Sequence, residues 1–319
     1  MNADDRLPFD LEIRPGHVWS FHELPPRSIA LDGAVQGPQL DPATRRYSFD
    51  HHAGCVRLVT SATCRQVWDA LLLGLNPTGY RVLLNDLDGD TVLSVFLLAS
   101  WTSLRSPATR EDLYPLVQAV ADGDAHGPAY PLLRPDLACY FHTVVLQGLR
   151  SAREMGFPDG ERQALLDALQ ALHRFLAGGL QTALTPPSFP AEQKLKIIHD
   201  GRFVMAVSEG TTLADAGLAR RLYDAGHQRI VLGAPLQVGR YRYTLAKRSD
   251  FVDAFPIDRL LRVLNQEEER TTGSPLGLKA RWGGASTIGG SPRPEGSRLT
   301  PEQVRQVVGD ELEQAESRS

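Results

Sequence analysis

The amino-acid sequence predicts an α/β fold divided into two domains. Short apolar runs alternate with stretches of helical periodicity, which is typical of strands and helices that build a parallel sheet. A segment with three prolines, residues 184–190, separates two such regions. The chain has 319 residues, 42% of them hydrophobic, enough for two cores. We therefore predict a mostly parallel, Rossmann-like sheet domain with a helical layer over residues 1–186, and a smaller α/β domain over residues 187–319.

The first domain should alternate strands with helices. Residues 8–37 contain prolines that break any long helix, so this segment is expected to be irregular apart from one strand. We expect strands over residues 27–33, 45–49 and 80–85, and helices over residues 64–75 and 91–100. Helical periodicity then predicts a helical layer from residues 111–121, 137–155 and 159–180.

The second domain shows the same alternation on a smaller scale. Strands are expected over residues 202–207, 229–232 and 240–246, and helices over residues 213–225, 257–266 and from about 301 onward. A glycine-dense loop is expected over residues 282–293.

Acidic and imidazole side chains follow the predicted strands of the first domain. Asp32 ends the first strand, Asp50-His51-His52 follows the second, and Asn85-Asp86-Leu87-Asp88-Gly89-Asp90 follows the third. Ligands of open α/β sheets gather outside the carboxyl ends of strands, so these side chains are expected to converge. Imidazoles with carboxylates suit manganese, iron or zinc. The alternatives are a surface turn with solvated histidines and an Asp-Gly-rich turn between strand and helix.

A further acidic stretch, Asp122-Gly123-Asp124-Ala125-His126, lies between two predicted helices. It is either an acidic loop that adds a ligand or the end of a helix followed by a turn.

The motifs together resemble the DHH phosphoesterase superfamily, metal-dependent hydrolases of phosphodiesters and phosphoanhydrides. Asp50-His51-His52 matches the motif that names the family, and Asp86-Leu87-Asp88 resembles its Asp-x-Asp motif, although here this motif comes second in the chain. The resemblance implies that Asp50, His51 and His52 are catalytic. It also implies one or two divalent ions, most readily Mn²⁺, held by ligands from separate strands: Asp32, Asp50, His51, Asp86, Asp88 and Asp124.

The second domain is similar to the substrate-binding domain associated with that family. The resemblance implies that a strand ending in Arg248-Ser249 and a glycine-rich loop face the metal site across a cleft. The glycines concerned are Gly283, Gly284, Gly289 and Gly290. The implied substrate is a small phosphorylated or nucleotide-like molecule or a short oligonucleotide. We expect His52 either to support a metal ligand from behind or to face phosphate, rather than to bind metal itself, because adjacent residues on a strand point in opposite directions.

Two other functions remain open. The histidine that usually accompanies the Asp-x-Asp motif is absent, which favours a catalytically degenerate relative that binds a nucleotide or a protein partner as a sensor. The stretch from Leu84 to Thr91 also resembles the first motif of haloacid-dehalogenase-type phosphatases, in which Asp86 would be the nucleophile.

Composition limits the choice of partner and compartment. A net charge of −4 and a pI near 6.1 provide no basic field for duplex nucleic acid. Three cysteines without a CxxC pair, an N-terminus without a secretion-signal profile and the absence of long apolar runs predict a cytoplasmic protein that does not span a membrane.

Overall fold

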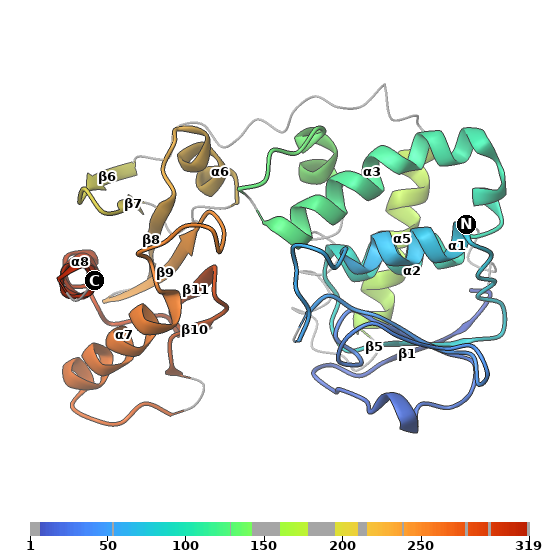
Figure 1. Cartoon of the computed structure of the whole chain (residues 1–319), viewed down its shortest axis with the longest axis horizontal. Helices are drawn as coiled ribbons and strands as arrows, with labels where there is room; N and C mark the ends of the chain where they lie inside the picture. The colour runs from blue at the N-terminus through green and yellow to red at the C-terminus, as the bar shows by residue number, and fades with distance from the viewer. Residues whose placement is uncertain are drawn as a thin grey trace. The chain divides into compact units, whose positions relative to one another are not determined.

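The structure is a computed structural model, and it describes residues 7–52, 54–127, 129–141, 160–177, 195–209, 216–237, 239–277, 280–292 and 295–317. Contacts divide the chain into two compact units, Met1–Ser188 and Phe189–Ser319. Both units combine helices with a sheet, which confirms the α/β class (Figure 1). The predicted linker at 184–190 and most of the helix predicted at 137–155 lie outside the described residues.

The first unit contains a five-stranded sheet in the order β1-β5-β2-β4-β3. Its strands are β1 (Asp10–Ile13), β5 (Arg81–Leu84), β2 (Ser28–Leu31), β4 (Arg46–Phe49) and β3 (Gln39–Asp41). The first four run parallel and only β3 is antiparallel. The sheet is thus mostly parallel, as the sequence predicts.

Alternation along the strands determines which side chains face the helices. Ile29 and Leu31 of β2 belong to the large core with the helices, whereas Ala30 packs on the opposite face with Phe21 and Leu24. The helices of this core are α1 (Thr63–Leu72), α2 (Gly89–Ala99), α3 (Pro107–His126) and α5 (Gly160–Ala177), which lie together above the sheet in Figure 1.

The first unit contains two strands that the sequence did not predict, β1 and β3. Residues 8–37 include β1, because Leu11 and Ile13 pack against the core and the strand pairs with β5. The stretch 122–126 is the last part of α3, which ends where Gly127 adopts a φ of 72°. This confirms the helix end, one of the two alternatives that the sequence left open. Asp124 is therefore carried by a helix.

The second unit contains a six-stranded, mainly antiparallel sheet in the order β10-β11-β9-β8-β7-β6. Its strands are β6 (Leu195–His199), β7 (Val204–Ser208), β8 (Arg229–Gln237), β9 (Arg240–Lys247), β10 (Gly283–Gly284) and β11 (Ile288–Gly290). Only β7 and β8 pair in parallel. The helices are α6 (Ala216–Asp224), α7 (Ile257–Thr272) and α8 (Pro301–Glu316). The sequence did not predict β6, because its residues, Leu-Lys-Ile-Ile-His, do not alternate strictly between apolar and polar.

The glycine-dense segment forms a β-hairpin, β10 and β11, instead of the predicted loop. Its glycines permit close backbone contact: a Cβ on Gly284 would lie 2.3 Å from the Cα of Gly289, and a Cβ on Gly290 would lie 2.6 Å from the carbonyl oxygen of Tyr243. These glycines therefore have a structural reason to be present that is independent of any ligand.

The hairpin provides a stability test with a matched control. Gly284→Ala should lower the free energy of unfolding by about 2 kcal/mol, because the new methyl group has no space without a backbone shift. Gly283→Ala should have little effect, since a Cβ there meets no atom within 4 Å. Urea unfolding of the two variants measures the difference, and equal stabilities would contradict the hairpin geometry.

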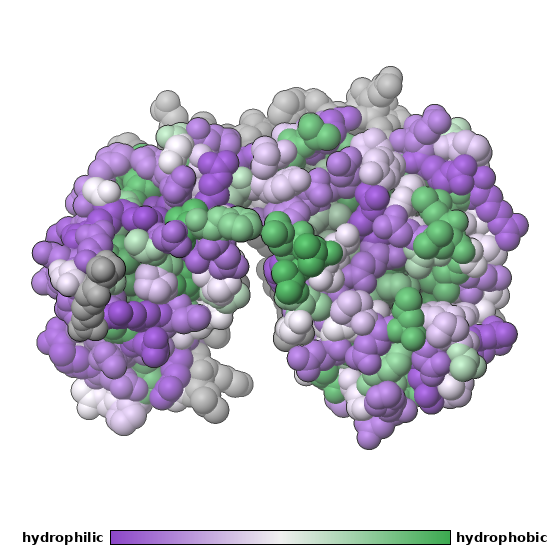
Figure 2. All heavy atoms as spheres, viewed as in Figure 1, coloured by the Kyte–Doolittle hydropathy of each residue, from purple (hydrophilic) through white to green (hydrophobic). Residues whose placement is uncertain are grey.

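Within the described part of the chain, no helix is both long enough and apolar enough to cross a membrane. The surface in Figure 2 is predominantly hydrophilic, interrupted by apolar patches.

Candidate metal centre

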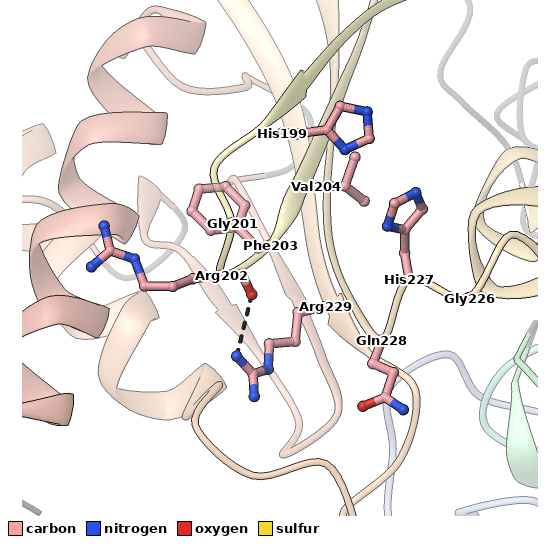
Figure 3. Close-up of a pocket in the computed structure, with 9 residues that line it drawn as sticks. All are labelled: His199, Gly201, Arg202, Phe203, Val204, Gly226, His227, Gln228 and Arg229. Carbon is pink, nitrogen blue, oxygen red and sulfur yellow. Dashed lines mark hydrogen bonds between the residues drawn. The ribbon is translucent and has the colours of Figure 1, made fainter.

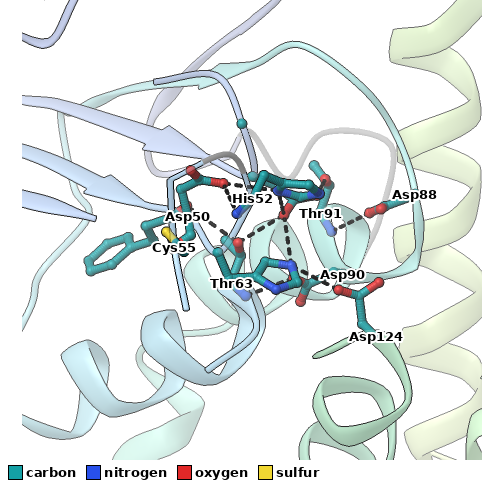
Figure 4. Close-up of polar contacts among 12 residues, drawn as sticks. Asp50, His52, Cys55, Thr63, Asp88, Asp90, Thr91 and Asp124 are labelled. Atoms are coloured by element: carbon teal, nitrogen blue, oxygen red, sulfur yellow. Dashed lines mark hydrogen bonds and ion pairs between the residues drawn. The ribbon is translucent and has the colours of Figure 1, made fainter. Parts of the chain in front are cut away.

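Three strand ends and one helix end of the first unit bring acidic and imidazole side chains together. Asp32 directly follows β2, and His51 and His52 follow β4, which lies beside β2 in the sheet. Asp90 lies in the first turn of α2, which begins after the neighbouring strand β5. Asp124 comes from the last turns of α3. Figure 4 shows the side chains of His52, Asp90 and Asp124 around one region at the carboxyl ends of the strands.

His51 lies at the centre of this cluster, and its side chain is fully buried. Its Nε2 atom is 2.8 Å from Oδ2 of Asp124, 3.5 Å from Oδ2 of Asp90 and 3.6 Å from Oδ1 of Asp32. None of these contacts has the geometry of a hydrogen bond, so both ring nitrogens are buried without a hydrogen-bond partner. Buried polar atoms normally have a hydrogen-bond partner. The ring nitrogens of His51 have none, which indicates that this imidazole serves to bind a ligand such as a metal ion.

Two overlapping groups in this cluster could hold a metal ion. One consists of Asp32, His51 and His52, and the other of His51, Asp90 and Asp124; within each group the ligand atoms lie within 4.8 Å of one another. His51 belongs to both groups. Imidazole nitrogen and carboxylate oxygen are ligands of manganese, iron and zinc, so the donor set fits a divalent transition metal.

Neighbouring donors hold the carboxylates in place. The carboxylate of Asp90 accepts hydrogen bonds from the backbone N–H groups of Thr63 and Cys64, each at 2.7 Å, at the N-terminus of α1. The carboxylate of Asp32 accepts from the hydroxyls of Thr63 and Thr91, each at 2.9 Å. Hydrogen bonds of this kind orient the ligands of metal sites before the metal binds.

Asp32 also has an unusual backbone conformation. Its φ of 51° lies in the left-handed region, and its N–H donates to the carbonyl oxygen of Phe49 at 2.9 Å. Non-glycine residues adopt this conformation rarely and at a free-energy cost, which is common at binding sites. Here the conformation turns the carboxylate toward the two threonine hydroxyls.

Asp50 anchors the loop that carries the histidines. Its carboxylate accepts from the N–H groups of Gly37 at 2.7 Å and His52 at 3.0 Å, and it contacts Nδ1 of His52 at 2.9 Å. Within the described residues Asp50 belongs to neither ligand group. The expectation that His51 and His52 point in opposite directions is wrong, because their ring centroids are 4.6 Å apart. Both residues follow the end of β4, where strand alternation no longer applies.

Repulsion between the carboxylates changes their protonation. Burial, followed by the charges of Asp32 and Asp124, raises the pKa of Asp88 to about 8 and the pKa of Asp90 to about 7. Burial alone would lower the pKa of His51, but the carboxylates of Asp124, Asp32 and Asp90 raise it to about 10. Without a cation, the site therefore holds protons at neutral pH.

Two other predicted ligands, Asp88 and Asp86, lie outside the two ligand groups. Asp88 is half-buried, and its carboxylate accepts from Thr91 N at 2.9 Å as the N-cap of α2. Asp86 is exposed, and its carboxylate contacts the N–H of Leu87 at 2.7 Å. The described residues that form the two ligand groups include neither of them. Their part in metal binding stays a prediction.

Sequence reasoning did not select Asp90, although it belongs to the predicted acidic run. The available signal was its place in the first turn of a helix directly after a buried strand. Its carboxylate is held in the site by the backbone N–H groups of Thr63 and Cys64 at the N-terminus of α1. These residues precede Asp90 by 27 and 26 positions, and a local sequence pattern does not reveal contacts over such a separation.

The residues expected to bind substrate lie in the second unit. Arg248 is exposed, and its N–H donates to the carbonyl oxygen of Gln228 at 2.8 Å, while the hydroxyl of Ser249 accepts from the N–H of Phe251 at 3.3 Å. Gly283, Gly284, Gly289 and Gly290 form the hairpin described above. Substrate binding by these residues stays a prediction.

No known family model matches the sequence, and no curated protein matches it either. The similarity to the DHH superfamily therefore stays a resemblance based on motifs.

The raised pKa values predict how the stability of the metal-free protein depends on pH. Aspartates of an unfolded chain release their protons near pH 4, whereas Asp88 and Asp90 of the folded chain release theirs near pH 8 and 7. The folded state thus binds more protons in this window, and stability must fall as pH rises through it. His51 acts in the same direction above pH 6.5, because its folded pKa is about 10.

We expect the protein in EDTA to lose stability on the order of 2 kcal/mol between pH 6 and pH 8. Excess Mn²⁺ should restore it, since the cation replaces the protons. Denaturant unfolding at the two pH values, with and without Mn²⁺, measures this. If the metal-free protein became more stable from pH 6 to pH 8, the pKa values of Asp88, Asp90 and His51 in the folded state would not be raised, and the prediction would be wrong.

Proposed function

We propose that this protein is a metal-dependent phosphoesterase that hydrolyses a phosphodiester or phosphoanhydride bond in a small nucleotide-like or short oligonucleotide substrate. The observation that carries the proposal is the convergence of Asp32, Asp90 and Asp124 on the buried, unsatisfied imidazole of His51. Three carboxylates packed around one buried ring repel one another unless cations neutralise them. The motif resemblance and this geometry support the same chemistry.

We propose different residues for metal binding and for contact with the substrate. Asp32, His51, Asp90 and Asp124 would hold the metal, and we propose Mn²⁺ as the ion because the donors mix nitrogen with oxygen. A bound divalent cation polarises a phosphoryl oxygen and lowers the pKa of a coordinated water toward about 7. The threonine hydroxyls of Thr63 and Thr91 keep Asp32 oriented.

His52 is the residue placed to contact the substrate. Its side chain is 39% exposed, whereas that of His51 is fully buried. Nδ1 of His52 donates to the carboxylate of Asp50, and this contact raises the pKa of His52 and so favours its protonated form. In that form Nε2 also carries a proton, which it can donate as a hydrogen bond to phosphate or transfer to the leaving oxygen. His52 is thus proposed as the general acid, and Asp50 as the residue that stabilises and orients its protonated ring.

A Mn²⁺-dependent assay with bis(p-nitrophenyl) phosphate tests this function. The wild-type chain should hydrolyse the diester with Mn²⁺ and lose the activity in EDTA. In His51→Ala, activity should fall at least about a hundredfold because metal affinity is lost. His22→Ala, a change at an exposed histidine of the same unit, should retain full activity.

The same assay separates the alternatives. A haloacid-dehalogenase-type phosphatase would lose activity in Asp86→Asn and retain it in His51→Ala, the reverse of the proposal. A sensor without catalysis would bind nucleotide but show no Mn²⁺-dependent turnover. Either outcome would replace the phosphoesterase proposal.

A further inference from the structure

A cavity of about 390 Å³ lies in the second unit, where β6 ends and where β7 and β8 begin. Figure 3 shows His199 and His227 beside it, with the guanidinium of Arg229 directed away from both rings. The register of β6, β7 and β8 agrees, because it places His199 and Arg229 on opposite faces of the sheet. These side chains do not converge on one point, so they do not form a single binding site.

The first unit, in contrast, has a cluster of aromatic and cationic side chains between β1 and the short helix η1 (Phe21–Glu23). Arg14 directly follows β1, and the turn after it carries His17 and Trp19. The guanidinium carbon of Arg14 lies 5.9 Å from the centroid of the Trp19 ring. The ring of His17 meets that of Trp19 at a steep angle, with centroids 4.5 Å apart. We call Arg14, His17 and Trp19 the aromatic cluster.

The aromatic cluster has a fixed inner part and an exposed outer part. Trp19 is half-buried and packs against the core on the sheet face opposite the helices. Arg14 and His17 are exposed, and Arg14 is also held by an ion pair with Glu12 at 2.5 Å. Among the described residues, the imidazole of His17 has no hydrogen-bond partner. A ligand can therefore reach the imidazole and the guanidinium, while the indole supports them from below.

Backbone hydrogen bonds place the aromatic cluster at the carboxyl edge of the sheet, where the metal centre lies. The N–H of Trp19 donates to the carbonyl oxygen of Ala34 at 2.8 Å, two residues after the proposed metal ligand Asp32. The N–H of Gly16 donates to the carbonyl oxygen of Asn85, also at 2.8 Å, and Asn85 directly follows β5. The turn that carries the cluster is thus bonded to the ends of two strands that build the metal centre.

Gly33 connects the aromatic cluster to His52, the proposed substrate-contacting residue. Its carbonyl oxygen accepts from the side-chain amide of Asn85 at 2.8 Å. A Cβ on Gly33 would lie 3.6 Å from Nδ2 of Asn85 and 3.8 Å from Nδ1 of His52. Asn85 and His52 therefore flank the same glycine. A substrate with its phosphate group at His52 can extend past Asn85 toward the aromatic cluster.

The side chains of the aromatic cluster suit a nucleobase. Nucleobases stack on aromatic rings, histidine included, and on the plane of arginine guanidinium groups. A guanidinium is also attracted to the face of an aromatic ring. A sugar or a chain of phosphates has no flat face that could make these contacts. The cluster therefore favours a ligand that carries a base.

We propose that the aromatic cluster is a nucleobase site of the metal centre, in which the base stacks on His17 and Arg14 with Trp19 as their support. The inference rests on the phosphoesterase function proposed above, and it narrows the substrate to one that carries a nucleobase close to the reacting phosphate. His17 then determines specificity without taking part in the chemical step.

Calorimetric titration of the full chain in saturating Mn²⁺ tests the site, with AMP and ribose 5-phosphate as probes. The two molecules share the sugar and the phosphate group and differ only in the adenine base. AMP should bind at least about tenfold more tightly, because only AMP can stack on the cluster.

His17→Ala should weaken AMP binding about fivefold to a hundredfold and leave the affinity for ribose 5-phosphate unchanged. His17→Phe should restore most of the AMP affinity, since phenylalanine keeps a ring on which the base can stack. His22→Ala, at an exposed histidine outside the cluster, is the control and should bind both probes like the wild type. Because His17 is exposed, none of these changes should disturb the core.

Several results would overturn the nucleobase site: equal affinity of the wild type for the two probes, no saturable binding of AMP at millimolar concentration, or a His17→Ala variant that binds AMP like the wild type. Equal weakening of both probes in His17→Ala would also overturn it, as would failure of His17→Phe to restore AMP binding.

Hydrolysis of bis(p-nitrophenyl) phosphate, measured on the same proteins, separates this inference from the proposed function. Mn²⁺-dependent hydrolysis with equal binding of AMP and ribose 5-phosphate would support the phosphoesterase and overturn the nucleobase site. Selective AMP binding through His17 without hydrolysis would support the nucleobase site and overturn the phosphoesterase.

Discussion

Asp90→Asn should weaken Mn²⁺ binding by at least about a hundredfold and lower diester hydrolysis by a similar factor, because a ligand charge is lost from the centre of the site. The carboxylate of Asp90 lies 3.5 Å from Nε2 of His51 and belongs to the second ligand group. Asparagine has the same shape as aspartate but its amide oxygen is a poorer metal ligand. The substitution should therefore reduce metal affinity strongly and the stability of the fold only slightly.

The metal-free Asp90→Asn variant should remain folded. Asparagine retains one acceptor for the N–H groups of Thr63 and Cys64. It also removes a charge that is disfavoured by burial and by the charges of Asp32 and Asp124, which together raise the pKa of Asp90 to about 7. Thermal unfolding in EDTA and calorimetric titration with Mn²⁺ measure the two properties separately. Asp69→Asn, at a half-exposed aspartate of α1 paired with Arg65, is the control and should bind Mn²⁺ normally. Wild-type Mn²⁺ affinity in Asp90→Asn would exclude Asp90 as a ligand.

Asp50→Ala should cause the largest loss of stability, about 3 kcal/mol, and should also abolish efficient hydrolysis. The substitution leaves the N–H groups of Gly37 and His52 without their acceptor and releases the ring of His52. Unlike Asp90→Asn, this change should act first on the fold of the loop and on the position of the proton donor.

Urea unfolding and the Mn²⁺ titration separate these effects of Asp50→Ala. Mn²⁺ affinity should fall less than in Asp90→Asn, because Asp50 lies outside both ligand groups of the described residues. Asp41→Ala removes a carboxylate that accepts from the N–H groups of Ala43 and Thr44 in a more exposed turn, and its stability loss should be much smaller. If Asp50→Ala were no less stable than Asp41→Ala, the anchoring role of Asp50 would be wrong.

Strand ends were the most predictable part of the candidate site. Asp32, His51 and His52 follow buried strands, and the parallel arrangement places the ends of β2 and β4 side by side. A local pattern of apolar residues followed by acidic or imidazole side chains is sufficient for this inference, because the sheet geometry supplies the rest.

Contacts between distant elements were not predictable. The N-terminus of α1 holds the carboxylate of Asp90. The last turns of α3 carry Asp124, and the sequence did not decide between a loop and a helix end for this stretch. Both depend on how helices pack over the sheet, which local patterns do not encode. Edge strands such as β1 and β6 were missed for a related reason: pairing with β5 and β7 defines them, and their own sequences show little alternation.

The most direct test of the account is a calorimetric titration of the metal-free wild-type chain with Mn²⁺, compared with His51→Ala. A metal centre built around His51 predicts saturable binding of one or two ions with release of protons, and at least about a hundredfold weaker binding in His51→Ala. Absence of saturable binding to the wild type, or equal affinity of the two proteins, would contradict a metal centre built around His51.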